Sequence, residues 1–448
     1  ERGMTPMAIQ LSDHFNYKKL LRFTLPCIIM MIFTSIYSIV DGFFVSNFAG
    51  KTPFAAINFI MPFLMILGAF GFMFGTGGSA LIAKTMGEGK QEEAKRLFSL
   101  FVYVSSGFGV IIAVIGLLFL KPIAAALGAE GELLTNCVAY GRIILLALPA
   151  FMLQYEFQSF FTTAEKPKLG LAVTIAAGVT NILLDALFVA GFNWGLTGAA
   201  AATAASQLVG GILPVFYFLR PNTSSLRLVK TTFDGKALAK ACANGSSELM
   251  TNISTSIVSM LYNMQLMKYA GENGVAAYGV LMYVNFIFLA AFIGYAVGTA
   301  PIIGYQYGAG NHAELKNLLK RSLVIISIVS VCMFGLGEVL AKPLTHIFVG
   351  YDKTLLVITL RAFFIFSFSF LFAGLSIFGS SFFTALNNGL VSALISFLRT
   401  LVFQLAAVLI FPLIWELDGI WASIIAAECL SAIVTVLFLI RMRKKYHY

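Results

Sequence analysis

Twelve long apolar runs dominate the sequence and restrict its fold more than any other feature. A transmembrane helix needs about 20 apolar residues, and every run is long enough. The runs cover approximately residues 23–48, 54–83, 97–120, 133–164, 169–191, 196–219, 241–270, 275–305, 317–341, 354–386, 390–415 and 418–440. Only 11% of the residues are charged, compared with about 25% in soluble domains. Because lipid cannot satisfy backbone polar groups, we predict an all-α integral membrane protein with twelve transmembrane helices.

The basic residues are distributed unevenly between the predicted loops. Twelve spans place both termini on one side, and that side carries 22 Lys and Arg residues in its loops against 5 on the other. An excess of Lys and Arg is typical of cytoplasmic loops, which predicts cytoplasmic termini. This placement explains the net charge of +10 without a nucleic-acid partner.

The two halves of the chain resemble each other. Shifted by 221 positions, residues 54–98 align without a gap on residues 275–319, so that Gly77 meets Gly298 and Gly87 meets Gly308. Six spans in each half give the repeats the same orientation in the membrane. We predict an N-terminal lobe of six helices over residues 1–219, a basic cytoplasmic linker over 220–240, and a C-terminal lobe of six helices over 241–448.

Four polar residues in the first half fall at similar depths in three predicted spans. Asp185 and Asn181 are four residues apart and therefore share one helix face. Asp41 in the first span and Thr203 in the sixth span lie at a comparable level. Ionisable residues at this depth usually face a bundle interior or a wet cavity. This all-oxygen set suits a Na⁺ ion, or a proton held between two carboxylates.

Three further acids within the predicted spans have two alternative roles. Glu156, Glu248 and Glu428 lie within predicted spans, and the second half has Tyr262 at the position that aligns with Asp41. These acids either handle substrate or pair with a neighbour, such as Arg399. Pro26 removes one backbone hydrogen bond early in the first span, which permits either a static bend or a hinge.

Motifs of enzymes are missing from the sequence. It contains no His-Glu-x-x-His, no Gly-x-Ser-x-Gly and no nucleotide-binding Gly-rich Lys loop. The five cysteines do not have the spacing of a metal site or a disulfide framework. We expect a protein that is not an enzyme, has no cofactor or bound metal other than a coupling ion, and is driven by an ion gradient.

Over essentially its whole length the chain resembles the multidrug and toxic compound extrusion (MATE) family. The resemblance rests on the twelve spans, the two lobes, the basic linker and the loop pattern Gln306-Tyr-Gly-Ala-Gly-Asn311. It is closest to the branch with its ion site in the N-terminal lobe, because the Asp, the Asn-x-x-x-Asp and the Thr of that branch match Asp41, Asn181, Asp185 and Thr203. A second branch has an acid in span ten, which is missing here, although Glu248 matches its acid in span seven.

The resemblance implies an antiporter that exports lipophilic, often cationic, compounds in exchange for H⁺ or Na⁺. It implies two lobes in a V around a central cleft, with ion binding coupled to rearrangement of the first span near Pro26. Glu156, Glu248 and Glu428 are candidate acids of the substrate cleft. We expect a monomer in the plasma (inner) membrane of a prokaryote.

Three other interpretations compete with this one. A flippase for lipid or lipid-linked oligosaccharide from the same superfamily would have more basic residues in its cleft and often extra spans. A membrane-embedded enzyme would need a catalytic constellation. A channel would repeat its pore signature, whereas the buried acids of the two halves differ.

Overall fold

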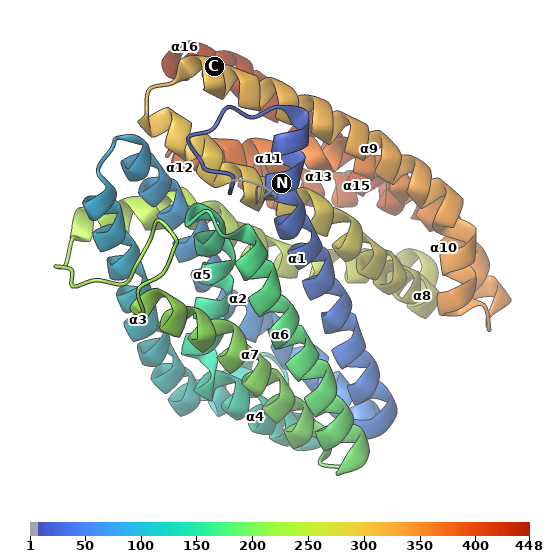
Figure 1. Cartoon of the computed structure of the whole chain (residues 1–448). Helices are drawn as coiled ribbons and strands as arrows, with labels where there is room; N and C mark the ends of the chain where they lie inside the picture. The colour runs from blue at the N-terminus through green and yellow to red at the C-terminus, as the bar shows by residue number, and fades with distance from the viewer. Residues whose placement is uncertain (1–7) are drawn as a thin grey trace, which may run out of the picture.

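The structure is a computed structural model that describes residues 8–448, and these residues form helices without a β-strand. The N-terminal lobe contains the following helices: α1 (Tyr17–Phe44), η1 (Val45–Ala49), α2 (Lys51–Gly87), α3 (Gln91–Ala126), α4 (Gly131–Leu146), α5 (Leu148–Thr163), α6 (Pro167–Asp185), η2 (Ala186–Gly191) and α7 (Gly195–Leu219). In Figure 1 these blue-to-green helices pack together as one group.

The C-terminal lobe repeats this arrangement with more interruptions. Its helices are α8 (Gly235–Gly308), α9 (His312–Val349), α10 (Lys353–Phe366), η3 (Ser367–Ser369), α11 (Phe370–Ala385), α12 (Gly389–Phe397), η4 (Leu398–Val402), α13 (Phe403–Ile410), α14 (Pro412–Trp415), α15 (Leu417–Arg441) and α16 (Arg443–Tyr446). The prediction of an all-α membrane protein with two six-helix lobes is confirmed. The boundaries of the lobes and the linker stay predictions.

The breaks within the predicted fourth and tenth spans were not visible as gaps in the apolar pattern. Among the described residues, ten helices are long and apolar enough to cross a membrane, and α4 and α5 form a further span bent by 59°. Helix α8 has 74 residues but turns at Gly271, whose φ is 65°, a conformation that glycine adopts easily. Its two parts counted separately yield the twelve predicted spans. The predicted tenth span comprises α10 and α11, joined by η3.

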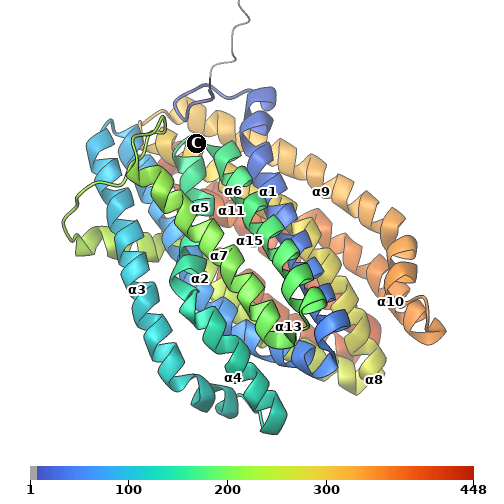
Figure 2. The same cartoon turned by 60° about the horizontal axis from the view of Figure 1, so that its bottom comes forward.

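Segments from both ends of the described chain lie at the same end of the bundle, here called the terminal face. The ring of Tyr446 is 5.5 Å from the ring of Tyr307 at the end of α8, and Gln306 Nε2 donates to the carbonyl of Leu11 at 3.1 Å. In Figure 2 both segments lie toward the upper end of the bundle. The α8–α9 loop therefore marks this face.

The lobes contact each other backbone to backbone near the terminal face. A methyl group on Gly308 would lie 2.0 Å from the carbonyl oxygen of Lys84, and one on Gly87 would lie 1.9 Å from that of Tyr305. The two contacts are equivalent under the internal repeat, because Gly87 corresponds to Gly308 and Lys84 corresponds to Tyr305 at the shift of 221 residues. Such close approach is possible only without side chains, so these glycines set the distance between α2 and the second part of α8.

Two extended segments cross between the lobes at the same face. Residues 8–16 lead into α1, but Asn317 Nδ2 of α9 donates to the carbonyl of Phe15 at 2.8 Å. The segment 220–234 leads into α8, but the backbone N–H of Val229 donates to Ser99 Oγ of α3 at 2.8 Å. The segment that leads into each lobe is therefore hydrogen-bonded to the third spanning helix of the other lobe, which is α9 in one case and α3 in the other.

Glu165, in the loop between α5 and α6, contacts the first of these segments. Burial and the nearby Asp13 carboxylate raise the pKa of Glu165, while the backbone N–H of Leu11 and the Lys166 cation oppose this change. Helix α6 thus starts at the terminal face, and its far end points away from it.

Substitution of Gly308 by Ala tests the contact between the lobes. We expect Gly308→Ala to separate α2 from α8 at the terminal face, because its methyl group would overlap the Lys84 carbonyl. Spin labels on the exposed residues Lys90 and Ala313 would report a longer distance by pulsed electron resonance. Gly279→Ala is the matched control, since nothing lies within 4 Å of its added methyl group. Equal distances in both variants would contradict the prediction.

Candidate functional site: a carboxylate pair in the N-terminal lobe

Three of the four predicted site residues come together between α1 and α6. With the Asn181 amide nitrogen facing the acids, this nitrogen donates to Asp185 Oδ2 at 2.9 Å and to Asp41 Oδ1 at 3.1 Å. The carboxyl groups of Asp41 and Asp185 are also within hydrogen-bonding reach of each other. One amide therefore bridges two acids from different helices.

The site is largely buried and has no basic partner among residues 8–448. Asp185 is completely buried, Asn181 is buried and Asp41 is half-buried. Within residues 8–448, neither acid forms an ion pair with a Lys, Arg or His, and Asp185 Oδ1 has no hydrogen-bond partner. Two carboxylates so close together repel each other strongly at low dielectric. A proton or a cation between them removes that repulsion.

Gly178 explains how α1 comes close enough to α6 for this bridge. A methyl group on Gly178 would lie 2.4 Å from the Phe33 ring and 2.7 Å from the Tyr37 ring. Gly178 precedes Asn181 by three residues, and Tyr37 precedes Asp41 by four, so both contacts lie about one turn before the site. The glycine is therefore a positioning residue for the pair.

Both acids also lie next to a change in helix geometry. Asp185 is the last residue of α6, after which η2 forms a π-helical segment, and Asp41 lies one turn before the π-helical η1. Segments of this kind are rare in proteins and frequent at functional sites. Each acid is thus followed by a segment in which the helix is wider.

Thr203, the fourth predicted residue, lies beside Tyr140 of α4. The two hydroxyl groups are neighbours, and Tyr140 is near both acids. Neither hydroxyl has a well-formed hydrogen bond within the described chain, although Tyr140 is buried. Tyr140 was not predicted from sequence, because one tyrosine in an apolar run is an ordinary residue.

Tyr37 is a second residue that the sequence did not reveal. It lies one turn before Asp41 on α1, and its hydroxyl is near the side chain of Gln154 on α5. Polar side chains therefore extend from the acid pair into the interior of the N-terminal lobe.

The remaining predicted acids lie apart from the pair. Glu156 is completely buried and hydrogen-bonds to Ser105 of α3. Glu248 is half-buried in the first part of α8, and no ion pair forms at its carboxylate among residues 8–448. Their role as acids of a substrate cleft stays a prediction.

Glu428 has the partner that the sequence offered as an alternative. Arg399 Nε is 2.9 Å from Glu428 Oε2, and Arg399 Nη2 is 3.1 Å from Glu428 Oε1. Nearby, Tyr262 donates its hydroxyl proton to Gln404 Oε1 at 2.6 Å. The C-terminal lobe thus has a neutral hydrogen bond where the repeat aligns Asp41, and the charges of Arg399 and Glu428 cancel each other.

Pro26 is buried within α1, which continues as a helix on both sides of it. The next residue, Cys27, lies 3.1 Å from Thr162 Oγ1 of α5, measured from Cys27 Sγ. The predicted role of Pro26 as a hinge stays a prediction. No group of three or more His, Cys, Asp or Glu side chains suited to a metal ion occurs among residues 8–448.

Known proteins match the chain in sequence and in fold. The MatE family model matches twice, over residues 26–187 and 249–410. The "Multidrug export protein MepA" of Staphylococcus saprophyticus is 26% identical over 444 residues, which cover 95% of this chain and 94% of that protein.

Two solved structures have the same fold. A crystal structure of MATE in complex with MaL6 has a TM-score of 0.92 at 23% identity and covers 98% of both chains. An outward-facing multidrug resistance MATE family transporter of the MOP superfamily has a TM-score of 0.91 at 22% identity, again with 98% of both chains covered.

Substitution of Gly178 tests how the carboxylate pair is positioned. We expect Gly178→Leu to push α1 away from α6 and to break the bridge through Asn181. In infrared difference spectra recorded across a pH titration, the carboxylic C=O band that Asp185→Asn removes should shift in Gly178→Leu. Gly107→Leu is the control, because its added methyl group meets nothing within 4 Å. An unchanged band in Gly178→Leu would contradict this positioning role.

Single and double substitutions test the Arg399–Glu428 pair. Removing one partner of a buried ion pair costs about 3–5 kcal/mol, whereas replacing both with apolar residues is often neutral. We therefore expect Arg399→Met to lower the midpoint of thermal unfolding clearly, and Arg399→Met combined with Glu428→Leu to recover most of the loss. A double variant that is less stable than the single one would argue against a compensated pair.

Proposed function

Since the chain belongs to the MatE family, we propose that it is a multidrug exporter that exchanges lipophilic, cationic compounds for H⁺ or Na⁺. The observation that carries this proposal is the pair of acids, Asp41 and Asp185, bridged by Asn181 within a membrane-spanning lobe. The multidrug export protein of S. saprophyticus supports it, because the similarity extends over nearly the whole of both chains. The proposed setting is the plasma membrane, with both termini in the cytoplasm.

Exchange follows from the charge of the pair. When the site is open to the outside, a proton or Na⁺ neutralises Asp41 and Asp185 and weakens the attraction for a cationic compound. When the site is open to the inside, the ion leaves, and the restored negative charge attracts the next compound. Export against a concentration gradient is then driven by the downhill movement of the ion.

The amide of Asn181 can serve either ion, according to which of its ends faces the acids. With the nitrogen toward the pair it donates to both carboxylates, and a protonated carboxyl group can donate to its neighbour at the same time. A Na⁺ ion would instead need the amide oxygen to face the pair.

Transport in proteoliposomes tests the proposed function. We expect efflux of the fluorescent cation ethidium to be driven by an imposed pH gradient and to fall more than tenfold in Asp41→Asn and Asp185→Asn, because these variants lose the titrating groups. Separate runs with a Na⁺ gradient identify the ion. Glu248→Gln is the matched acid-to-amide control in the other lobe and should retain coupling.

Other outcomes would change the assignment. Loss of coupling in Glu248→Gln together with normal coupling in Asp185→Asn would move the ion site to the C-terminal lobe. Absence of efflux under both gradients would contradict export of drug cations and would favour the lipid flippase.

A further inference from the structure

A groove with a volume of about 260 Å³ runs along the outer surface of the C-terminal lobe between α11 and α15. Phe372 and Leu375 of α11 form one wall. The other wall is a stripe of α15 that includes Ile433, Val436 and Leu437, whose side chains are 40–60% exposed. Both helices belong to spans that are long and apolar enough to cross a membrane. The groove therefore opens toward the hydrocarbon of the bilayer.

The packing of α11 against α15 explains why the groove exists. At its back the two helices touch, because a methyl group on Gly379 would lie 2.2 Å from Thr435 Cγ2. Thr435 Oγ1 is also 3.5 Å from Ser376 Oγ. Farther out, Cys429 and Ala432 line the groove with side chains too short to fill the space between the helices. The helices are thus in close contact on one side and leave a hollow on the other.

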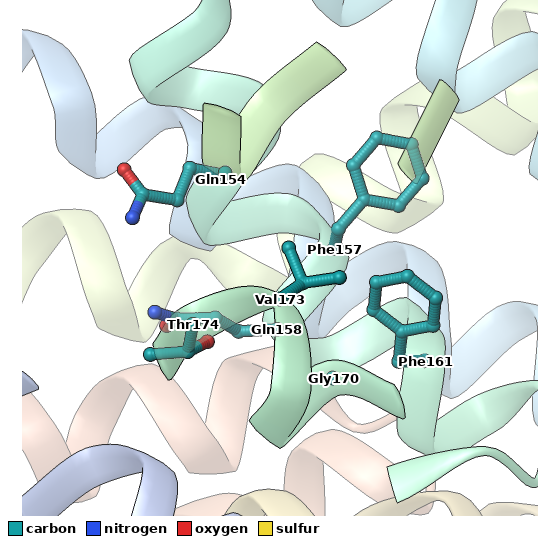
Figure 3. Close-up of a pocket in the computed structure, with 8 residues that line it drawn as sticks. Gln154, Phe157, Gln158, Phe161, Gly170, Val173 and Thr174 are labelled. Carbon is teal, nitrogen blue, oxygen red and sulfur yellow. The ribbon is translucent and has the colours of Figure 1, made fainter. Parts of the chain in front are cut away.

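The groove differs from the polar cavity inside the N-terminal lobe. Figure 3 shows that cavity, whose lining includes Gln154, Gln158 and Thr174. Its volume is about 10 Å³, which is close to the space that one bound water needs. The groove is far larger, and its lining side chains are apolar apart from one cysteine. A flexible apolar chain fits it better than water does.

The groove follows α15 through one leaflet of the membrane. Cys429, Ile433 and Leu437 are spaced at intervals of four residues and share one helix face. From Cys429 to Leu437 the helix rises about 12 Å, which is most of one leaflet in a hydrocarbon core about 30 Å thick. Helix α15 ends at Arg441, close to the terminal face. The groove therefore lies in the leaflet that adjoins this face.

Positive charge is concentrated where the groove reaches the terminal face. Arg441 follows Leu437 by four residues and continues the same face of α15. Arg443 and Lys444 follow in α16, and all three basic side chains are exposed. Among residues 8–448, none of the three forms an ion pair with an Asp or Glu. The groove thus ends at uncompensated cations near the membrane surface.

We propose that the groove and Arg441 form a binding site for an anionic phospholipid of the leaflet at the terminal face. One acyl chain would lie along the groove, and the lipid phosphate would contact Arg441. Because lipid tails are as apolar as Leu, the chain is held by van der Waals contacts with the two walls. The preference for an anionic lipid comes from the guanidinium group, which can bind a phosphate through two hydrogen bonds.

A lipid in this site would restrain the helix that carries the buried ion pair of the C-terminal lobe. Cys429 lines the groove and directly follows Glu428, which pairs with Arg399. A chain held between α11 and α15 therefore supports the segment of α15 that positions Glu428. Because a ligand that binds only the folded state stabilises it, the anionic lipid should stabilise the protein.

Photoactivatable lipids in nanodiscs test the preference for an anionic headgroup. Phosphatidylglycerol with a diazirine in one acyl chain is compared with phosphatidylcholine that carries the same chain, and mass spectrometry identifies the labelled residues. We expect phosphatidylglycerol to label residues 372–375 and 429–437 about fivefold more, since one basic residue near the surface favours an anionic lipid about fivefold. Arg441→Gln should abolish this difference. Arg22→Gln, which removes an exposed charge from α1, is the matched control and should preserve it.

A variant that fills the groove tests the binding of the acyl chain. Ala432→Phe places a ring in the groove and should reduce labelling of α11 by phosphatidylglycerol about fivefold. Leu430→Phe is the matched control, because Leu430 is exposed on the same helix but does not line the groove. Phosphatidylglycerol should also raise the midpoint of thermal unfolding of the wild type and of Leu430→Phe, and less that of Ala432→Phe. A single peak in size exclusion shows that each variant is folded, and Arg441→Gln decides the question if Ala432→Phe is not.

Several results would overturn the lipid site. Equal labelling by both lipids in the wild type would identify ordinary boundary lipid without a bound headgroup. Unchanged labelling in Arg441→Gln and Ala432→Phe would have the same meaning. Loss of labelling at high protein density in the membrane would show that a second copy of the chain covers the groove. None of these measurements involves ethidium or an ion gradient, so the proposed exchange is tested separately.

Discussion

The interaction on which the functional part of the structure depends is a single amide that bridges two acids in a low-dielectric interior. Asn181 donates to Asp41 and to Asp185, and no basic residue of the described chain compensates their charge. Repulsion between the acids makes this arrangement sensitive to one bound proton or cation. Because Asp41 belongs to α1 and Asp185 to α6, occupancy of the site also changes the force between these two helices, which meet closely at Gly178.

The contact between the lobes follows a different principle. It uses glycines and backbone carbonyls, related by the internal repeat, in place of charged or large apolar side chains. A contact of this kind fixes the distance between the two helices, since a backbone atom cannot move aside as a flexible side chain can. The extended segments 8–16 and 220–234 reinforce it through hydrogen bonds to the opposite lobe. The terminal face is therefore closed by features that lie outside the ion-binding candidates.

The sequence was sufficient for the fold because transmembrane spans and internal repeats leave strong patterns. It also brought Asp41, Asn181 and Asp185 together, since charged residues are rare at that depth and their spacing fits one helix face. It did not reveal the break at Ala147 or the interruption by η3, which depend on local backbone geometry within apolar runs. Tyr37 and Tyr140 were missed because their position relative to the acids depends on packing between helices that are distant in sequence. The roles of the predicted site residues stay predictions.

The Arg399–Glu428 pair has a consequence for how the membrane's electric field acts on this molecule. A paired cation and anion have no net charge, so the field exerts almost no net force on them. In the proposed exchange, the acid pair of the N-terminal lobe changes its net charge when it binds or releases an ion. A charge that crosses the full membrane gains about 2.3 kcal/mol per 100 mV. In that exchange the voltage would therefore act on the acid pair and hardly at all on the Arg399–Glu428 pair, although the two pairs belong to corresponding halves of a duplicated architecture.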